Sequence, residues 1–320
     1  MNSSTSSSEG ARHWVIAWVC VTFVPLALFL GSTEALIRTQ VSPVDLARRH
    51  REFFFATGVA ATSAVFGDSH AARGFTGVDG FVNLARPGEV LDRTRQKLAL
   101  FTAGAGHRRV ILQVGPHAFA PYRQERAPGP YRLTPWWAPR IRESNHRDNW
   151  FRYWGVALSG RSFIPNRVLQ PDGAQTAPEE ESGGGRDVVD LAAARVLEHR
   201  PLADPAATPS AIDLEGILDD LAKRDVEVCL TSFPVSPEYM REAARHPEFE
   251  RAVRFLAEIA RRHGVVYVDQ RERFDDSTLF FNPDHLTLEG ARRFAPICVT
   301  ACFGASALET AAAEVTTTSR

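Results

Sequence analysis

The sequence predicts an α/β fold with a parallel sheet, preceded by one transmembrane helix. Five short apolar runs alternate with segments whose apolar residues recur at helical spacing, a pattern typical of strand–helix–strand units. A longer uncharged run, Trp14 to Leu30, lies near the start of the chain. The first pattern predicts an α/β domain over residues 61–305, and the second predicts a membrane anchor over residues 14–31.

The N-terminal run is long enough to cross a bilayer. It follows a short polar tail, residues 1–13, and a spanning helix needs about 17 to 25 apolar residues. Only Thr33-Glu34-Ala35 offers a weak signal-peptidase site, so we expect an uncleaved anchor. Basic residues flank both ends, and charge alone leaves the orientation open. A single N-terminal anchor most often exports the domain behind it, so we expect this domain on the extracytoplasmic, periplasmic side.

The strand–helix rhythm begins after an Arg-rich stalk, residues 32–60. The expected strands are β-branched, bounded by turn residues and buried, and they cover 63–67, 80–84, 109–115, 226–232 and 265–269. The expected helices cover 89–101, 210–223 with Ser210 as N-cap, and 247–263 with Gly264 as C-cap. Such a sheet binds ligands at the carboxyl ends of its strands.

Residues 120–209, approximately, interrupt the rhythm, and we interpret them as an insertion. They are rich in Pro and Gly and include a Glu179–Gly185 run expected to be a flexible loop. Their aromatic residues, with Trp136 and Trp137 as candidate substrate contacts, can form a sugar platform, a local core or a membrane-interface patch. Residues 306–320 are expected to be a disordered tail.

Composition excludes several classes of protein. The 320 residues are 44% hydrophobic and 23% charged, which suffices for one sizeable core. A formal net charge of -1 provides no basic footprint, so no nucleic-acid partner is expected. The four cysteines lack zinc-type spacing, so no metal site is expected, and a pairing of Cys229 with Cys298 or Cys302 stays open.

Two segments carry candidate chemistry. Asp68-Ser69-His70 follows the first expected strand, and Asp284-His285-Leu286-Thr287 lies far downstream, ahead of a helix. A serine hydroxyl is a poor nucleophile until a base takes its proton, so this arrangement indicates acyl chemistry with Ser69 as nucleophile and His285 as base. The alternatives are a turn or cap serine, and a surface histidine ahead of a Thr287 N-cap.

These residues resemble the sequence blocks of the SGNH/GDSL hydrolase superfamily in its Gly-Asp-Ser-His form. The first, second, third and fifth blocks correspond to 67–70, 83–88, 115–117 and 284–287, within the ranges 60–119 and 226–297. The resemblance implies a three-layer, flavodoxin-like domain. With its anchor, the chain is also similar to extracytoplasmic proteins that O-acetylate polysaccharides or assist D-alanylation of teichoic acids beside a membrane-bound O-acyltransferase.

The resemblance further implies an oxyanion site. It places the donors at the backbone N–H of Ser69, at Gly88, and at the third-block position, where His117 stands in place of asparagine. His117 can donate only in the right tautomer, and a loop histidine is the alternative. We expect Asp68 to fix the loop through hydrogen bonds, and the role of His70 stays open.

The orienting acid departs from the family pattern. An aspartate is expected three residues before the catalytic histidine, and that position is Asn282. An amide oxygen can orient the imidazole, but it does not stabilise the imidazolium as a carboxylate does. The acids that can substitute are Asp284, Asp269, Asp275 and Asp276. Asp284 adjoins His285, and we interpret it as a solvated or capping residue.

Three functions follow from these observations. The first is a membrane-anchored O-acetyltransferase acting on a cell-surface polysaccharide through an acyl-Ser69 intermediate, without metal or soluble cofactor. The second is an esterase that passes the acyl group to water, which the sequence does not separate from the first. The third is a catalytically weak accessory protein that binds glycan or a membrane-bound O-acyltransferase, for which Asn282 and His117 argue.

Overall fold

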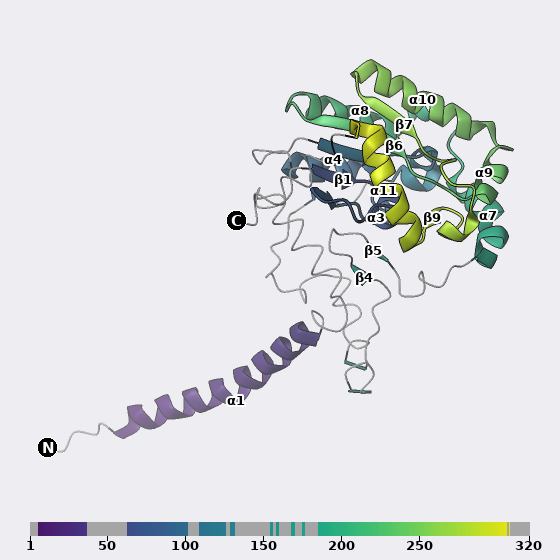
Figure 1. Ribbon diagram of the computed structural model, residues 1–320. Coiled ribbons are helices and arrows are strands. Elements are labelled where there is room, and N and C mark those ends of the chain that lie inside the picture. The colour runs from purple at the N-terminus through teal and green to yellow at the C-terminus, as the bar shows by residue number, and fades with distance from the viewer. Residues whose placement is uncertain are drawn as a thin grey trace. The chain divides into compact units, whose positions relative to one another are not determined.

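The predicted α/β architecture is confirmed by the computed structural model of the protein (Figure 1). The structure describes residues 6–36, 63–101, 109–125, 129–131, 154–155, 158–159, 168–169, 175–176, 185–305 and 307. The predicted stalk after residue 36, Trp136 and Trp137, and the predicted tail after residue 307 lie outside the described residues. The chain divides into two units, residues 1–46 with 136–165 and residues 47–135 with 166–320, and each is described by itself.

The first unit contains the N-terminal helix α1 (Ser6–Leu36). Its stretch Arg12–Leu36 is long and apolar enough to cross a membrane. Near its carboxyl end, Trp154 stacks on the Phe29 ring at 5.2 Å and donates its indole N–H to Thr33 Oγ1 at 3.0 Å. This tryptophan of the predicted insertion therefore packs against the apolar helix.

The second unit is built on a sheet of five parallel strands in the order β2-β1-β3-β6-β7. The strands are β1 (Ser63–Phe66), β2 (Phe81–Asn83), β3 (Arg109–Gln113), β6 (Glu227–Ser232) and β7 (Val266–Asp269). The chain order along the sheet is thus 2-1-3-4-5, the flavodoxin-like order, and it reverses between β1 and β3.

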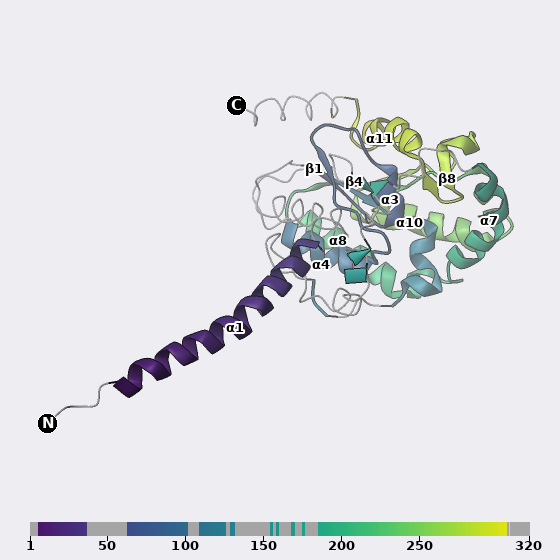
Figure 2. The same cartoon turned by 90° about the horizontal axis from the view of Figure 1, so that it is seen from below.

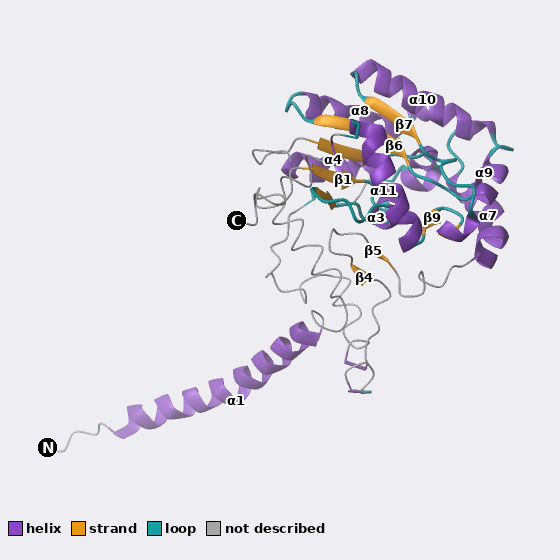
Figure 3. Ribbon diagram, viewed as in Figure 1, coloured by secondary structure: helices purple, strands orange, loops and turns teal. Residues whose placement is uncertain are grey.

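Helices cover both faces of this sheet (Figures 2 and 3). One face packs against α4 (Leu91–Phe101), α8 (Pro209–Ala222) and α10 (Pro247–His263), and the other against α3 (Ser69–Gly74) and α11 (Leu288–Phe303). Alternate residues of β3 serve the two cores, because side chains along a strand point to opposite faces. A disulfide joins Cys229 of β6 to Cys302 of α11, which settles the pairing that the sequence left open.

The remaining elements surround the carboxyl edge of the sheet. The helices are α7 (Gly185–His199) and α9 (Pro237–Ala243), and the short strands are β4 (Val168–Leu169), β5 (Gln175–Thr176), β8 (Phe280–Asn282) and β9 (His285–Leu286). Short 3₁₀ turns are η2 (Pro116–Phe119), η3 (Pro121–Arg123), η6 (Pro205–Ala207) and η7 (Ser277–Leu279). Helix α7 lies inside the range interpreted as an insertion, and it packs against α9 and β8.

Two local predictions were wrong and one was confirmed in detail. The cap of α8 is Thr208, whose side chain accepts the Ala211 N–H, because Pro209 already takes a helical position before Ser210. Strand β7 is not buried: it lies at the sheet edge, and Val266 is 48% exposed. Helix α10 has the predicted bounds, and Gly264 ends it at a positive φ of 65°.

Candidate active site

The candidate site lies where the strand order of the sheet reverses. Asp68 lies two residues after the end of β1 and His117 follows β3, so both residues stand beyond the carboxyl ends of the two strands that flank the reversal. Open α/β sheets bind their ligands at this point. The segments that contain Asp68 and His117 therefore meet at the edge of the sheet where such folds bind ligands.

The turn that presents Ser69 depends on a glycine. Gly67 has φ of +149°, a conformation that side chains rarely adopt, and a Cβ there would lie 2.8 Å from Gln113 Cβ. Gln113 Oε1 in turn accepts the Asp68 N–H at 3.0 Å. Asp68 then caps α3 by accepting the His70 N–H at 2.9 Å, so Ser69 is the first residue of that helix.

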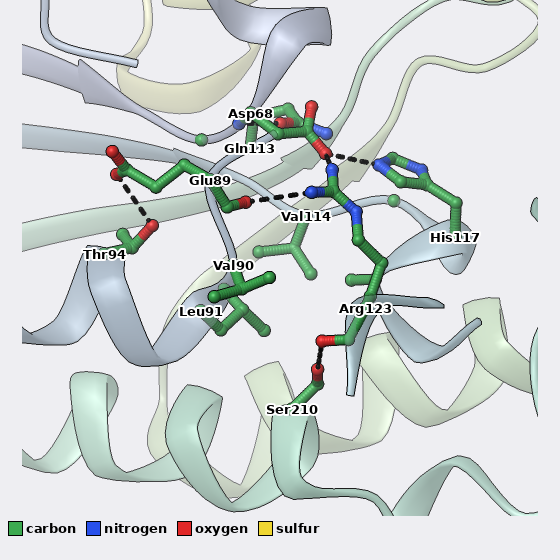
Figure 4. A pocket seen from close by; sticks show the side chains of 13 residues that line it. Asp68, Glu89, Val90, Leu91, Thr94, Gln113, Val114, His117, Arg123 and Ser210 are labelled. Carbon is green, nitrogen blue, oxygen red and sulfur yellow. Dashed lines mark hydrogen bonds and ion pairs between the residues drawn. The ribbon is translucent and has the colours of Figure 1, made fainter. Parts of the chain in front are cut away.

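Asp68 is the centre of a buried hydrogen-bond cluster (Figure 4). One carboxylate oxygen accepts from His70 Nδ1 at 2.9 Å, and the other accepts from His117 Nε2 at 2.6 Å and from Arg123. Burial alone would raise the pKa of Asp68, but the neighbouring Arg123, His117 and His70 lower it well below its usual range. Asp68 therefore fixes the loop through hydrogen bonds, as the sequence predicts.

His117 is committed to this cluster. A carboxylate only accepts hydrogen bonds, so the His117 proton lies on Nε2 and is donated to Asp68. Burial lowers the pKa of His117 to about 4, against the opposing effect of Asp68, which keeps the ring neutral at pH 7. A neutral ring has one N–H, so this geometry leaves His117 no second proton for an oxyanion.

His285 is oriented by the residue that replaces the expected acid. His285 Nδ1 lies 2.9 Å from Asn282 Oδ1, and the Asp284 backbone N–H also donates to that oxygen at 3.2 Å. The backbone donor identifies this atom as the amide oxygen, so Nδ1 carries the proton and Nε2 carries a lone pair. Nε2 is buried and has no hydrogen-bond partner among the described residues. Burial also lowers the pKa of His285, which favours the neutral ring.

Asp284 is neither solvated nor a cap, so that interpretation was wrong. The residue is 2% exposed, and its Oδ2 lies 3.4 Å from His285 Nδ1, 3.7 Å from His70 Nε2 and 3.8 Å from His199 Nε2. Its Oδ1 lies 3.1 Å from Arg195 Nε. Burial opposes ionisation, but His285, His70 and His199 hold the pKa of Asp284 well below its usual range. The reason for the burial is α7, which brings Arg195 and His199 over the carboxylate.

Four histidine rings gather between the two aspartates, and sequence reasoning missed one of them. His70 stacks on His117 at 4.3 Å and on His285 at 5.1 Å, while His199 lies 5.2 Å from His117. His199 Nδ1 also lies 3.1 Å from the Tyr239 hydroxyl, and burial lowers its pKa to about 2. No spacing signal in the sequence singles out Arg195 and His199 of α7 or Arg123 of η3, because each of these residues is of an ordinary type for its element.

The other predicted site residues are placed less closely together. Ser69 is half-buried, and within the described residues its hydroxyl forms no hydrogen bond, including none to His285. Gly88 has a positive φ of 73° and is exposed, in a loop that the Arg86 N–H ties to the Gly67 carbonyl at 3.1 Å. Asp269 pairs with Arg271, and Asp276 caps η7, so neither orients His285.

Among the residues that the structure describes, two sets of side chains have metal-ligand chemistry. Ligand atoms of Asp68, His70 and His117 lie within 4.8 Å of one another, as do those of His70, Asp284 and His285. Both carboxylates already face arginines, and the first also accepts three hydrogen bonds from its histidines. Protein groups therefore compensate the buried charges: the first set forms a hydrogen-bond network, and in the second Arg195 and the histidines surround the Asp284 carboxylate.

Small cavities adjoin the cluster. One of about 20 Å³ lies beside Asp68, Arg123 and Glu89, and another of about 10 Å³ lies beside His70, His117 and Tyr239. Figure 4 shows Arg123 spanning the first, between Asp68 and the Glu89 carbonyl, which accepts at 3.2 Å. Each has room for about one water molecule, so these cavities separate side chains and do not hold a substrate.

Comparison with known proteins adds a distant likeness. No protein-family model matches the chain, and no curated protein matches it. Among solved structures, the chain is similar to a Streptococcus pneumonia protein described as a platelet activating factor, with a TM-score of 0.39 and 14% identity. That similarity covers 90% of this chain and 98% of the other.

Proposed function

We propose that the protein is a membrane-anchored serine acyl-transfer enzyme, an O-acetyltransferase or acetylesterase acting on a cell-surface polysaccharide. The observation that carries the proposal is His285, whose Nδ1–H is held by Asn282 while the opposite nitrogen is buried, deprotonated and unpartnered among the described residues. This is the state that a general base needs before it takes a proton.

The nucleophile would be Ser69, at the start of α3 beyond the sheet's carboxyl edge. Its Oγ attacks the ester carbonyl, its proton moves to His285 Nε2, and His285 then gives that proton to the departing alcohol. Water or a sugar hydroxyl afterwards attacks the acyl-Ser69 ester and regenerates the serine. The backbone N–H groups of Ser69 and Gly88 are the donors for the oxyanion, since the His117 N–H is donated to Asp68.

An extracytoplasmic location fits two features of the chain. Helix α1 is long and apolar enough to anchor the protein, and the Cys229–Cys302 disulfide is of a kind that persists in oxidising compartments. A membrane-bound O-acyltransferase is the partner class that such a location suits, because it would deliver acyl groups across the membrane.

The test is acylation of the full-length protein in detergent micelles by an activated acetyl ester, followed by intact-mass spectrometry. We expect a one-acetyl adduct on the wild type, none on Ser69→Ala, and a much slower adduct on His285→Ala. His246→Ala, which changes a half-buried histidine at the start of α10, is the matched control and should acylate normally. A wild type that gains no adduct would exclude the serine mechanism for such esters and favour the accessory-protein function.

A further inference from the structure

The acid of a serine triad performs two tasks. It accepts the imidazole Nδ1–H, which fixes the tautomer, and its charge stabilises the imidazolium that forms when the serine loses its proton. Asn282 performs the first task, because its amide oxygen lies 2.9 Å from His285 Nδ1. An amide has no net charge, so the second task needs another group.

Asp284 is placed for that task although it adjoins His285 in the chain. Its Oδ2 lies 3.4 Å from His285 Nδ1, which is too long for a good hydrogen bond but close for two charges. The carboxylate is 2% exposed, and water screens charges much less at a buried site. Asp284 therefore acts on the charge of the ring, while Asn282 acts on its orientation.

Helix α7 places a positive charge beside this carboxylate, in an ion pair without a hydrogen bond. Arg195 Nε lies 3.1 Å from Asp284 Oδ1, which leaves Oδ2 toward the histidines. The groups that face Oδ2 are His285 of β9, His70 of α3 and His199 of α7, at 3.4, 3.7 and 3.8 Å. Arg195 is itself partly buried, so its charge is only partly screened by water.

We propose that Asn282 and Asp284 divide the role of the triad acid, with Arg195 as the positioning residue for Asp284. This inference rests on the proposed function. In the acylation step the Ser69 proton moves to His285 Nε2, the other proton stays on His285 Nδ1 and is donated to Asn282 Oδ1, and Asp284 remains a carboxylate throughout. The proton later leaves Nε2 with the alcohol, so no proton is transferred to either Asn282 or Asp284.

The test compares Asp284→Asn, Asn282→Asp and the double variant in the full-length protein. The pre-steady-state burst with a p-nitrophenyl acetate ester is measured from pH 5 to 9, with the His285 pKa followed by ¹⁵N-histidine NMR. For Asp284→Asn we expect the plateau acylation rate to fall at least about 100-fold, a part of the roughly 10⁴-fold loss when a triad acid becomes an amide. The acid limb and the His285 pKa should also move to lower pH, because Asp284 raises that pKa.

The plateau acylation rate of the double variant should be at least tenfold higher than that of Asp284→Asn, since a carboxylate again faces His285 Nδ1. Asn282→Asp alone should raise the acylation rate less than tenfold over wild type, because Asp284 already supplies the charge. A gain of 100-fold or more in Asn282→Asp would overturn the proposal, even if Asp284→Asn does not fold. An Asp284→Asn protein with wild-type burst rate and His285 pKa would overturn it too.

Arg195→Gln tests the positioning role. This variant should lower the acylation rate and shift the acid limb of the pH–rate profile. Arg195→Lys should restore part of the rate and part of the profile. Asp276→Asn, which removes an exposed carboxylate that caps η7, is the matched control for loss of one charge. A wild type without a Ser69 adduct would indicate that the proposed function itself fails. If the wild type is acylated and Asp284→Asn is acylated at the same rate, this inference alone is rejected.

Discussion

Asp68 and Asp284, which precede histidines by two residues and by one, have different partners in space. Asp68 takes hydrogen bonds from His70, His117 and Arg123, and so holds the loop that presents Ser69. Asp284 forms no such short bonds to the rings; its carboxylate stands 3.4 to 3.8 Å from three histidine nitrogens. At the residue scale, Asp68 therefore fixes the geometry of the loop, and Asp284 places negative charge beside the histidine rings.

Gly67 gives a residue-scale prediction. Gly67→Ala should lower the free energy of unfolding by about 1 to 3 kcal/mol, the usual cost of a strained backbone conformation, and should slow acylation of Ser69. The reason is that φ of +149° disfavours a side chain, and the added methyl would displace Gln113, which accepts the Asp68 N–H. Urea unfolding and the acetyl-adduct rate measure the two effects.

Gly216→Ala is the matched control for Gly67→Ala. Its methyl would meet the Arg95 guanidinium, a flexible group 38% exposed that can move aside at the cost of a weak surface pair with Asp220. Alanine is favoured over glycine inside a helix by about 0.5 to 1 kcal/mol, so this variant should be neutral or stabilising. Equal losses in the two variants would contradict the role assigned to Gly67.

At the element scale, helix α11 links the fold to the site. Its N-cap is Thr287, two residues after His285, and its last turn carries Cys302, bonded to Cys229 in β6. The same helix covers one face of the sheet with Phe294, Ala295 and Val299. The helix thus anchors the β8–β9 segment that carries Asn282 and His285 to the interior of the sheet.

Reduction of the disulfide should destabilise this arrangement. The cross-link joins residues 73 apart, and loop-closure entropy for that separation corresponds to about 4 kcal/mol. We expect urea unfolding in detergent to show a loss of that order when a reductant is added. The loss should vanish in Cys302→Ala, whose protein has no bond to reduce.

Cys298→Ala is the control, because it removes a neighbouring thiol and leaves the disulfide intact. Burial raises the pKa of the Cys298 thiol to about 12, so it stays protonated and does not attack the adjacent bond. The reductant should therefore destabilise Cys298→Ala as much as wild type. If reductant leaves the free energy of unfolding of the wild type unchanged, the cross-link does not stabilise the fold.

The whole molecule should lose stability on mild acidification. Burial lowers the pKa of His117 to about 4, that of His199 to about 2, and that of His285 below its usual value. Below pH 6.5 the unfolded chain therefore binds protons that the folded chain does not, and stability falls with pH. His117 and His199 should each contribute a loss of about 1.6 kcal/mol between pH 6.5 and pH 5.

Urea unfolding at pH 7.5, 6.0 and 5.0 measures this dependence. Asp68 and Asp284 have lowered pKa values, so their stabilisation is lost only below about pH 4 and does not overlap this window. His199→Gln should lower the slope of the unfolding free energy against pH between pH 6.5 and pH 5, because about one proton fewer is taken up on unfolding. A free energy of unfolding that is constant from pH 7.5 to pH 5.0 would show that these rings accept protons in the folded state.

Much of the fold could be predicted because its signals are local. Strands β1, β3 and β6 lie within the expected ranges, since short β-branched runs bounded by turn residues form strands wherever they pack. Helix α10 has the predicted bounds because its apolar spacing, its first-turn proline and its terminal glycine all lie within its own residues. The Thr208 cap was missed because Thr208 and Ser210 both have capping chemistry, and Pro209 between them decides which one is the cap.

The sequence by itself determined the sheet, the covering helices α4, α8, α10 and α11, the apolar helix α1, and the two segments that carry Ser69 and His285. Only the tertiary structure decided that Cys229 pairs with Cys302, that Asp284 is buried, and that α7 brings Arg195 and His199 to the site. The physical reason is the separation along the chain over which each interaction acts. Periodicity and caps act over a few residues, whereas burial and charge pairing depend on which distant elements the sheet order places together.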